Sequence, residues 1–211
     1  QGYVASYKST ELTRAAMTED YLFGDGLYQN WVDCYPAIRK DLYFVMDDSW
    51  DIPKDVNDSP NLYLGCVELS SDRFPSFRGD AVERLKQLSE QIKSKGWKGV
   101  GGWICAQKAE THAAIPEEEY WKQRIKAANA AGFDYWKVDW GKEDRNGEWR
   151  RKLTAIGKRY APHLYIEHAL RNEFIEFSDV FRTYDVENIT AQPITIRRIC
   201  DLLPYKTVEG A

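Results

Sequence analysis

The sequence predicts an α/β fold of parallel strands and, within that class, a (β/α)8 TIM barrel. Short apolar segments alternate with amphipathic segments along most of the 211 residues, a pattern that favours parallel strands joined by helices. Polar residues follow several of the apolar segments, and a barrel places its chemistry at the carboxyl ends of several strands. A doubly wound sheet is the competing architecture, but neither G-x-G-x-x-G nor G-x-x-x-x-G-K-[ST], its usual phosphate loops, occurs here.

The expected elements follow one another along the chain. Strands are expected at residues 41–48, 99–105, 133–140, 163–168 and 180–184, with a weaker pattern at residues 3–8. Helices are expected at residues 80–95, 117–131, 148–160 and 193–203, the first of them capped by Asp80. A complete barrel has eight strands and typically about 250 residues. We therefore expect about six βα units in one domain over residues 1–211, without one or two terminal units and without a C-terminal β domain.

Composition excludes several classes of function. The chain has 29 Lys and Arg against 33 Asp and Glu, so no broad basic field is available and nucleic acid is not an expected partner. No apolar run approaches the roughly 18 residues of a membrane span, so we expect no membrane. The four cysteines form no C-x-x-C pair and the three histidines no H-E-x-x-H motif, so we expect no metal. Cysteine usage leaves the compartment open, and we favour a secreted or periplasmic location.

One strand carries a lysine and an aspartate two positions apart. Lys137 and Asp139 share a strand face, because alternate side chains point the same way. A nearby ammonium keeps a carboxylate ionised, as a nucleophile must be. A structural ion pair would explain a lone K-x-D equally well. However, Asp47 and Asp48 end another strand and Asp185 follows Arg182 on a third, and like charges gathered on one face cost stability, so a functional site is the better interpretation.

Four motifs in order resemble the melibiase-type α-galactosidases and their α-N-acetylgalactosaminidase relatives. They are Asp47-Asp48-Ser49-Trp50 with the later Arg73-Phe74-Pro75, then Asp134-Tyr135-Trp136-Lys137-Val138-Asp139, then Tyr165-Ile166-Glu167-His168, and finally Arg182-Thr183-Tyr184-Asp185. The resemblance runs from about residue 41 to residue 203. Gly141 stands where many of these enzymes have a cysteine, and two residues rather than three separate Arg182 from Asp185.

The resemblance implies a retaining glycoside hydrolase for terminal α-galactoside-like sugars. Asp139 would be the nucleophile and Asp185 the acid/base of a double displacement. An oligosaccharide or glycoside would be the substrate, no cofactor would be needed, and the missing remainder of the barrel would be a further partner. The residues expected to bind substrate are Asp47, Asp48, Trp50, Trp103, Lys137, Glu167 and Arg182.

Two other functions remain open at this stage. A non-catalytic or degenerate carbohydrate-binding barrel would keep the aromatic residues and lose the acid/base, and the shortened spacing between Arg182 and Asp185 points that way. A barrel aldolase would use Lys137 as a Schiff-base amine, but a lysine beside a carboxylate stays protonated, which disfavours that chemistry.

The sequence also predicts the position of one long loop and the exposure of one helix face. Residues 52–79 form a long polar segment that we expect to overhang the carboxyl ends of the strands. Arg150, Arg151 and Lys152 are expected to form a solvated helix face.

Overall fold

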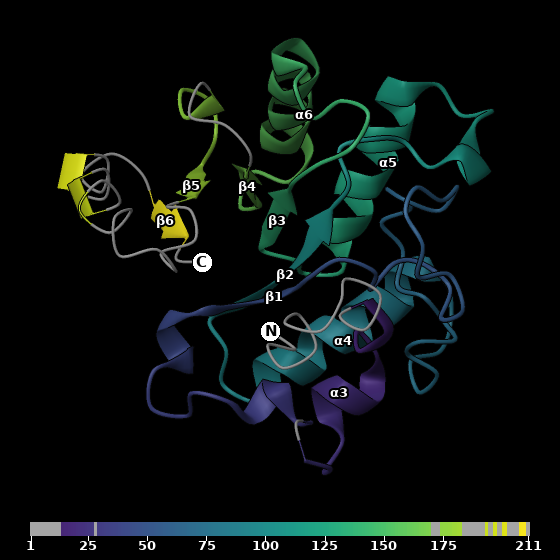
Figure 1. Ribbon diagram of the computed structural model, residues 1–211, viewed down its shortest axis with the longest axis vertical. Helices are drawn as coiled ribbons and strands as arrows, with labels where there is room; N and C mark the ends of the chain where they lie inside the picture. The colour runs from purple at the N-terminus through teal and green to yellow at the C-terminus, as the bar shows by residue number, and fades with distance from the viewer. Residues whose placement is uncertain are drawn as a thin grey trace.

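The computed structural model contains one parallel sheet of six strands with helices packed against it (Figure 1). It describes residues 14–27, 29–169, 174–182, 193, 196–197, 200–201 and 207–209. The strands are β1 (Tyr43–Met46), β2 (Gly99–Ile104), β3 (Tyr135–Val138), β4 (Tyr165–His168), β5 (Val180–Arg182) and β6 (Thr207–Glu209). The α-helices are α3 (Glu19–Phe23), α4 (Ala81–Ser94), α5 (Glu117–Ala130) and α6 (Gly147–Tyr160). Three short 3-10 turns lie at Trp31–Asp33, Arg39–Asp41 and Glu110–His112.

The expected parallel α/β fold is confirmed, with shorter strands than the sequence suggested. Five expected strands and three expected helices are present, and α4 begins after Asp80, whose carboxylate accepts the backbone N–H groups of Val82 and Glu83. Strand β6 was not predicted. The expected strand at residues 3–8 and most of the expected helix at residues 193–203 lie outside the described residues.

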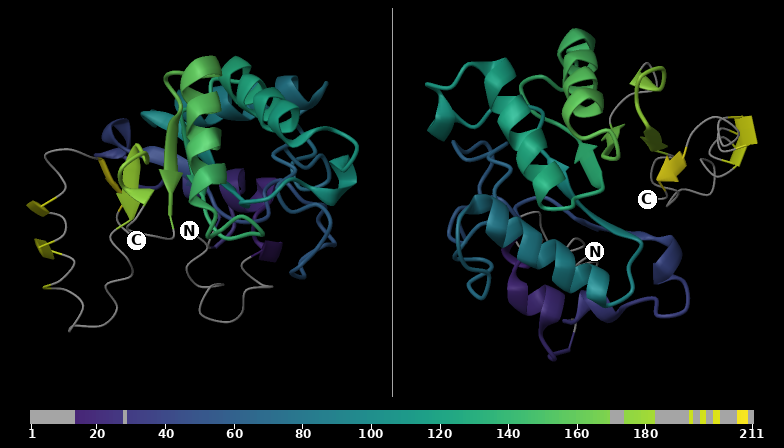
Figure 2. Two further views of the ribbon diagram at one scale, coloured as in Figure 1. Left: turned by 90° about the horizontal axis from the view of Figure 1, so that it is seen from above. Right: turned by 180° about the vertical axis from the view of Figure 1, so that it is seen from behind.

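The strand order separates the two candidate architectures. The strands lie in the sheet in the same order as in the chain, β1 to β6, and every neighbouring pair is parallel. Parallel crossovers are right-handed, so a sheet that never reverses its order receives its helices on one face. Helices α4, α5 and α6 lie on the outer side of the arc that the strands form (Figures 1 and 2). This singly wound order is that of a barrel wall and not of a doubly wound sheet.

Side chains of the strands alternate between a helix-packed face and an inner face. Most of the apolar core lies on the helix side, where strand residues such as Val100, Trp136 and Ile166 pack with residues of α4, α5 and α6. On the inner face, register pairs Trp103 with Lys137 and Lys137 with Glu167. Three residues of the expected site therefore form one row across β2, β3 and β4.

Gly102 makes room for a tryptophan on the helix side. A Cβ at this position would lie 2.9 Å from three atoms of the Trp50 ring. Trp50 is 1% exposed, stacks on Phe133, and donates from Nε1 to the Trp103 carbonyl at 2.8 Å. The indole is therefore a wedge between the sheet and the helix layer.

Substitution of Gly102 tests this packing. We expect Gly102→Ala to lower the free energy of unfolding by about 1–3 kcal/mol, since the buried indole cannot move without losing its hydrogen bond. Gly147→Ala is the matched control, because a Cβ there would meet Phe174 at an ordinary 3.6 Å and a first-turn helix position favours Ala over Gly. Equal midpoints in urea unfolding for the two variants would contradict the wedge.

Candidate active site

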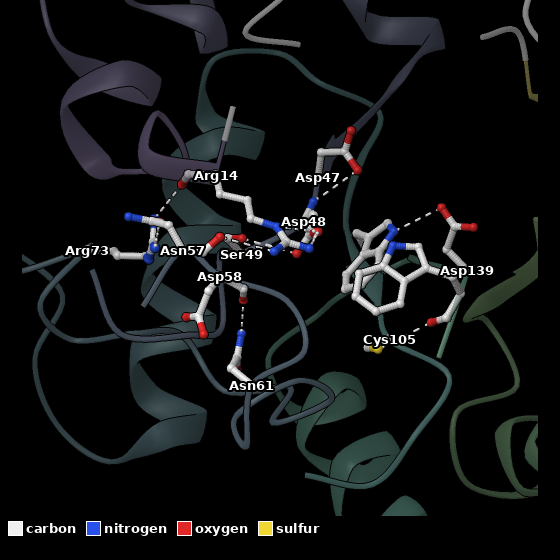
Figure 3. A network of polar contacts seen from close by, with 12 residues as sticks. Arg14, Asp47, Asp48, Ser49, Asn57, Asp58, Asn61, Arg73, Cys105 and Asp139 are labelled. Carbon is white, nitrogen blue, oxygen red and sulfur yellow. Dashed lines mark hydrogen bonds and ion pairs between the residues drawn. The ribbon is translucent and has the colours of Figure 1, made fainter. Parts of the chain in front are cut away.

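The candidate active site lies where β1, β2 and β3 end. Asp47 and Asp48 follow β1, and Asp139 follows β3 (Figure 3). Trp103 lies near the end of β2. The carboxyl ends of neighbouring parallel strands meet at one edge of the sheet, so the topology alone gathers these side chains.

Asp139 is held on three sides. Its backbone N–H donates to the Ile104 carbonyl at 3.0 Å, and its own carbonyl accepts from Arg150 Nη2 at 2.6 Å. Its carboxylate oxygen Oδ2 accepts from Trp103 Nε1 at 3.0 Å. The residue is 8% exposed, so the carboxylate is fixed in a largely water-free setting. Such a carboxylate is positioned to react with a group that enters from the inner face.

Arg150 lies behind Asp139, and the expectation that it belongs to a solvated helix face is wrong. It is fully buried, and donates to the carbonyls of Val138, Asp139 and Asp144. Burial lowers the pKa of Arg150 to about 10, which still leaves the guanidinium charged at neutral pH. Arg151 and Lys152 are exposed, as expected. Arg150 clamps the end of β3 from the helix side and so fixes the backbone of Asp139.

His168 faces α6 and not the inner face. Burial, with the charge of Arg150, lowers the pKa of His168 to about 3, so the ring is neutral. Arg150 Nη1 lies 3.2 Å from Nδ1, and Thr154 Oγ1 lies 2.8 Å from Nε2. Because a guanidinium can only donate, Nδ1 accepts and Nε2 carries the proton. His168 therefore supports the arginine clamp.

Lys137 and Glu167 are neighbours in register on the inner face. Both are buried, and Glu167 is 0% exposed. The phenol of Tyr135, two residues before Lys137, donates to Glu167 Oε2 at 2.6 Å. The structure thus brings together Lys137 and Glu167, which the sequence analysis expected to bind substrate, and adds Tyr135, which it did not expect there.

Asp48 is paired with an arginine from the N-terminal part of the chain. Arg14 donates to Asp48 Oδ2 from both Nε (3.0 Å) and Nη2 (2.8 Å). Burial raises the pKa of Asp48 above its ordinary value, while Arg14 opposes that rise. Asp47 is less buried, and its Oδ1 accepts from the Asp48 backbone N–H at 3.0 Å.

The two tryptophans expected at the site take different places. The expectation that Trp50 binds substrate is wrong, because the residue lies in the helix-side core and presents no ring face to the site. The register of the strands did not reveal this, because Trp50 stands four residues beyond the end of β1. Trp103 lies on the inner face, buried against Trp140, with its ring edge toward Asp139.

The loops that follow β2 and β3 are joined by their backbones. Ala106 donates to the Trp140 carbonyl and accepts from Glu143, both at 2.8 Å. Gly141 has φ +152°, and a Cβ there would lie 2.6 Å from the Ala106 carbonyl oxygen. This close approach leaves no room for a side chain at position 141, so a cysteine could not stand there without a shift of the loop.

Of the two remaining expected residues, the structure places the backbone of Arg182 but not Asp185. Arg182 ends β5 and pairs in register with Glu209, and Asp185 lies outside the described residues. No group of three or more His, Cys, Asp or Glu side chains suited to a metal occurs among the described residues. Within the same residues no helix is long and apolar enough to cross a membrane.

The sequence analysis did not single out Arg14, and it did not recognise that Arg73 and Arg150 are buried. Arg73 is 1% exposed and donates to the carbonyls of Ile52, Arg14 and Met17, among others. It thereby ties the long segment after β1 to the N-terminal part of the chain. The R-F-P motif marked this arginine only through resemblance, and no local pattern distinguishes a buried arginine from a solvated one.

Solved structures with a similar fold are glycosidases. A GH27 β-L-arabinopyranosidase from Geobacillus stearothermophilus matches with a TM-score of 0.61 and 16% identity, over 89% of this chain and 55% of that one. A variant of it in complex with arabinose matches with a TM-score of 0.62 and 16% identity, over 89% and 56%. An α-galactosidase from Mortierella vinacea has 19% identity over 72% of this chain and 40% of its own, with a TM-score of 0.45.

These neighbours belong to the melibiase-type clan that the motifs resemble. At such identities the likeness shows a common fold, and the chain spans about half the length of the arabinopyranosidase. No protein-family model matches the sequence. No curated protein matches it either.

Asp51 is a buried carboxyl beside the site. Its Oδ2 accepts from the Val67 backbone N–H at 2.8 Å, while its Oδ1 has no hydrogen-bond partner among the described residues. Burial raises its pKa from 3.8 to about 7, and the charge of Asp48 adds to the rise. The folded state therefore binds this proton more tightly than the unfolded chain does.

This carboxyl predicts how stability depends on pH. With a folded pKa above the unfolded one, the stabilisation by protonated Asp51 is fully present below about pH 4 and is lost as the pH rises to about 7. Between pH 5 and pH 8 we expect the wild type to lose stability relative to Asp51→Asn by about 3 kcal/mol. Urea unfolding at both pH values measures the difference. Asp58→Asn, at an exposed position of the same segment, should show the same pH dependence of stability as the wild type. If Asp51→Asn also showed the wild-type pH dependence, the raised pKa of Asp51 would be contradicted.

Proposed function

We propose that the protein is a retaining glycoside hydrolase that cleaves terminal α-galactoside-like sugars with Asp139 as its nucleophile. The observation that carries the proposal is the setting of Asp139. The carboxylate stands at the end of a parallel strand, is 8% exposed, accepts an indole N–H, and has its backbone clamped by a buried arginine. A nucleophile fixed in this way needs little reorganisation to reach the reacting carbon.

The reaction would proceed in two steps. In the first, an oxygen of Asp139 bonds to the anomeric carbon as the bond from that carbon to the leaving oxygen breaks, and Asp185 gives its proton to that oxygen. In the second, Asp185 takes a proton from water, the water oxygen attacks the anomeric carbon, and the bond to Asp139 breaks. Two inversions at one carbon give net retention. Asp139 and Asp185 would then lie roughly 5–5.5 Å apart.

The polar side chains at the ends of the strands and on the inner face would bind the sugar that is cleaved. Lys137 offers N–H donors, while Asp47, Asp48 and Glu167 offer acceptors, a combination that suits the hydroxyls of a pyranose. The arabinose bound to a similar fold supports a pentopyranose as an alternative to galactose. A panel of nitrophenyl α-galactoside, α-N-acetylgalactosaminide and β-L-arabinopyranoside would separate these substrates. Hydrolysis of none of them would favour a non-catalytic carbohydrate-binding barrel.

We also propose that further βα units complete the barrel. The described residues supply six strands, and Tyr165 on the inner face is 40% exposed. A closed eight-stranded wall would cover such a ring.

Asp139→Asn tests the nucleophile. Because an amide cannot form the covalent intermediate, we expect kcat to fall by at least about 10³-fold on every glycoside that the wild type hydrolyses. Asp144→Asn is the control, since this partly exposed side chain follows in the same loop and its backbone, not its carboxylate, contacts Arg150. Retained turnover in Asp139→Asn would reject the assignment.

Asp185→Asn tests the acid/base. Substrates with poor leaving groups need protonation, so they should lose about 10²–10⁴-fold, whereas aryl glycosides of acidic phenols should still release a burst of phenol. Azide needs no general base and should accelerate the second step, giving a glycosyl azide of retained configuration. An equal loss on both substrate types without azide rescue would assign Asp185 to substrate binding and direct attention to Glu167 or Glu187.

A further inference from the structure

Arg14 reaches the candidate site from a distant part of the chain. Its side chain is 4% exposed and lies between the Asp48 carboxylate and the Trp140 ring, with its guanidinium carbon 5.7 Å from the ring centroid. Two of its nitrogens donate to Asp48 Oδ2, and the third donates to the Asn57 carbonyl at 3.1 Å (Figure 3). It therefore contacts residues that follow β1 and β3 and the long segment between β1 and α4.

The hydrogen bonds at Asp48 leave room for one more donor. An ionised carboxylate offers about four acceptor positions. Arg14 occupies two at Oδ2, and Ser49 Oγ donates to Oδ1 at 3.1 Å. About one position at Oδ1 therefore stays open, and the Asp48 side chain is 16% exposed. A single hydroxyl of a ligand matches this remaining capacity.

The charges around Asp48 act in opposite directions. Asp47 raises the pKa of Asp48, and the carboxyl of Asp51, whose pKa is about 7, repels Asp48 once it is ionised. Arg73 also interacts electrostatically with Asp48, but it donates its hydrogen bonds to backbone carbonyls and to the Asn57 side chain. The nearby Cys105 thiol stays neutral, because burial raises its pKa. Arg14 is the cation that hydrogen-bonds the Asp48 carboxylate among the described residues, and without it burial would favour the protonated form.

We propose that Arg14 is a positioning residue of the sugar site, which holds Asp48 ionised and oriented so that Oδ1 accepts one hydroxyl of the substrate. This inference rests on the proposed function, because it assigns Asp48 to substrate binding. Arg14 is itself held in place, since Arg73 Nη1 donates to its carbonyl at 2.6 Å. Formation of the subsite thus depends on the packing of the segment from Arg14 to Met17 against Arg73.

The experiment compares Arg14→Met, which keeps an apolar stem, with Arg14→Lys, which keeps the charge. Two quantities are measured across pH 5–8: the titration of Asp48 by ¹³C NMR of its carboxyl carbon, and KM and kcat on the best nitrophenyl glycoside of the panel. In Arg14→Met we expect the Asp48 titration to move to higher pH. We expect KM to rise at least about tenfold at pH 5, with the rise shrinking toward pH 8, while kcat changes less than about threefold. Arg14→Lys should restore most of KM.

A double variant separates binding from folding. Arg14→Met leaves an unpaired buried carboxylate and can lower the midpoint of thermal unfolding, whereas Arg14→Met with Asp48→Asn removes both charges. We expect the double variant to recover the midpoint while KM stays high. Recovery of both, a fall in kcat with unchanged KM, or an unmoved Asp48 titration would overturn the proposal. Absence of hydrolysis by the wild type would reject the proposed function instead, and the Asp48 titration would still decide whether Arg14 controls its charge.

Discussion

In-register parallel pairing of β2, β3 and β4 is the constraint on which the site depends. Because side chains alternate along a strand, register decides which residues share the inner face, and it aligns Trp103, Lys137 and Glu167. A slip of one residue in β3 would turn Lys137 toward the helices and bring Trp136 out of the core, and the same slip in β4 would do this to Glu167 and Ile166. The apolar helix layer therefore fixes the polar row, since the burial of one face specifies the other.

Buried arginines make it possible to place carboxylates at these strand ends. Arg150 satisfies carbonyls that the end of β3 leaves open, and Arg14 pairs with Asp48, where burial raises the pKa of the carboxyl and Arg14 opposes that rise. Arg73 does not contact an expected site residue but holds the backbone of Arg14. Burial of a guanidinium is costly unless its donors are used, and here carbonyl and carboxylate oxygens use them. A cost in stability of this kind is typical of functional sites.

The two sides of Asp139 have separate tasks. From the helix side, Arg150 and the neutral His168 fix the backbone. From the inner side, the Trp103 N–H orients the carboxylate. Gly141 lets the following loop lie against Ala106, and the backbone hydrogen bonds of Ala106 join the segments that follow β2 and β3. Positional precision at this carboxylate therefore comes from packing around it and not from the residue itself.

The sequence by itself determined which segments are strands and helices, that the strands are parallel, and which strand ends carry carboxylates. These features follow from the local periodicity of apolar residues and from helix caps such as Asp80. It identified Lys137, Asp139 and Glu167 correctly as residues of one face. Only the tertiary structure decided that Trp50 packs in the core, that Arg150 is buried and that Arg14 pairs with Asp48. Trp50 depends on the space that Gly102 leaves, Arg150 on partners 6 to 18 positions away, and Arg14 on a carboxylate 34 positions away. None of these contacts leaves a local pattern in the chain.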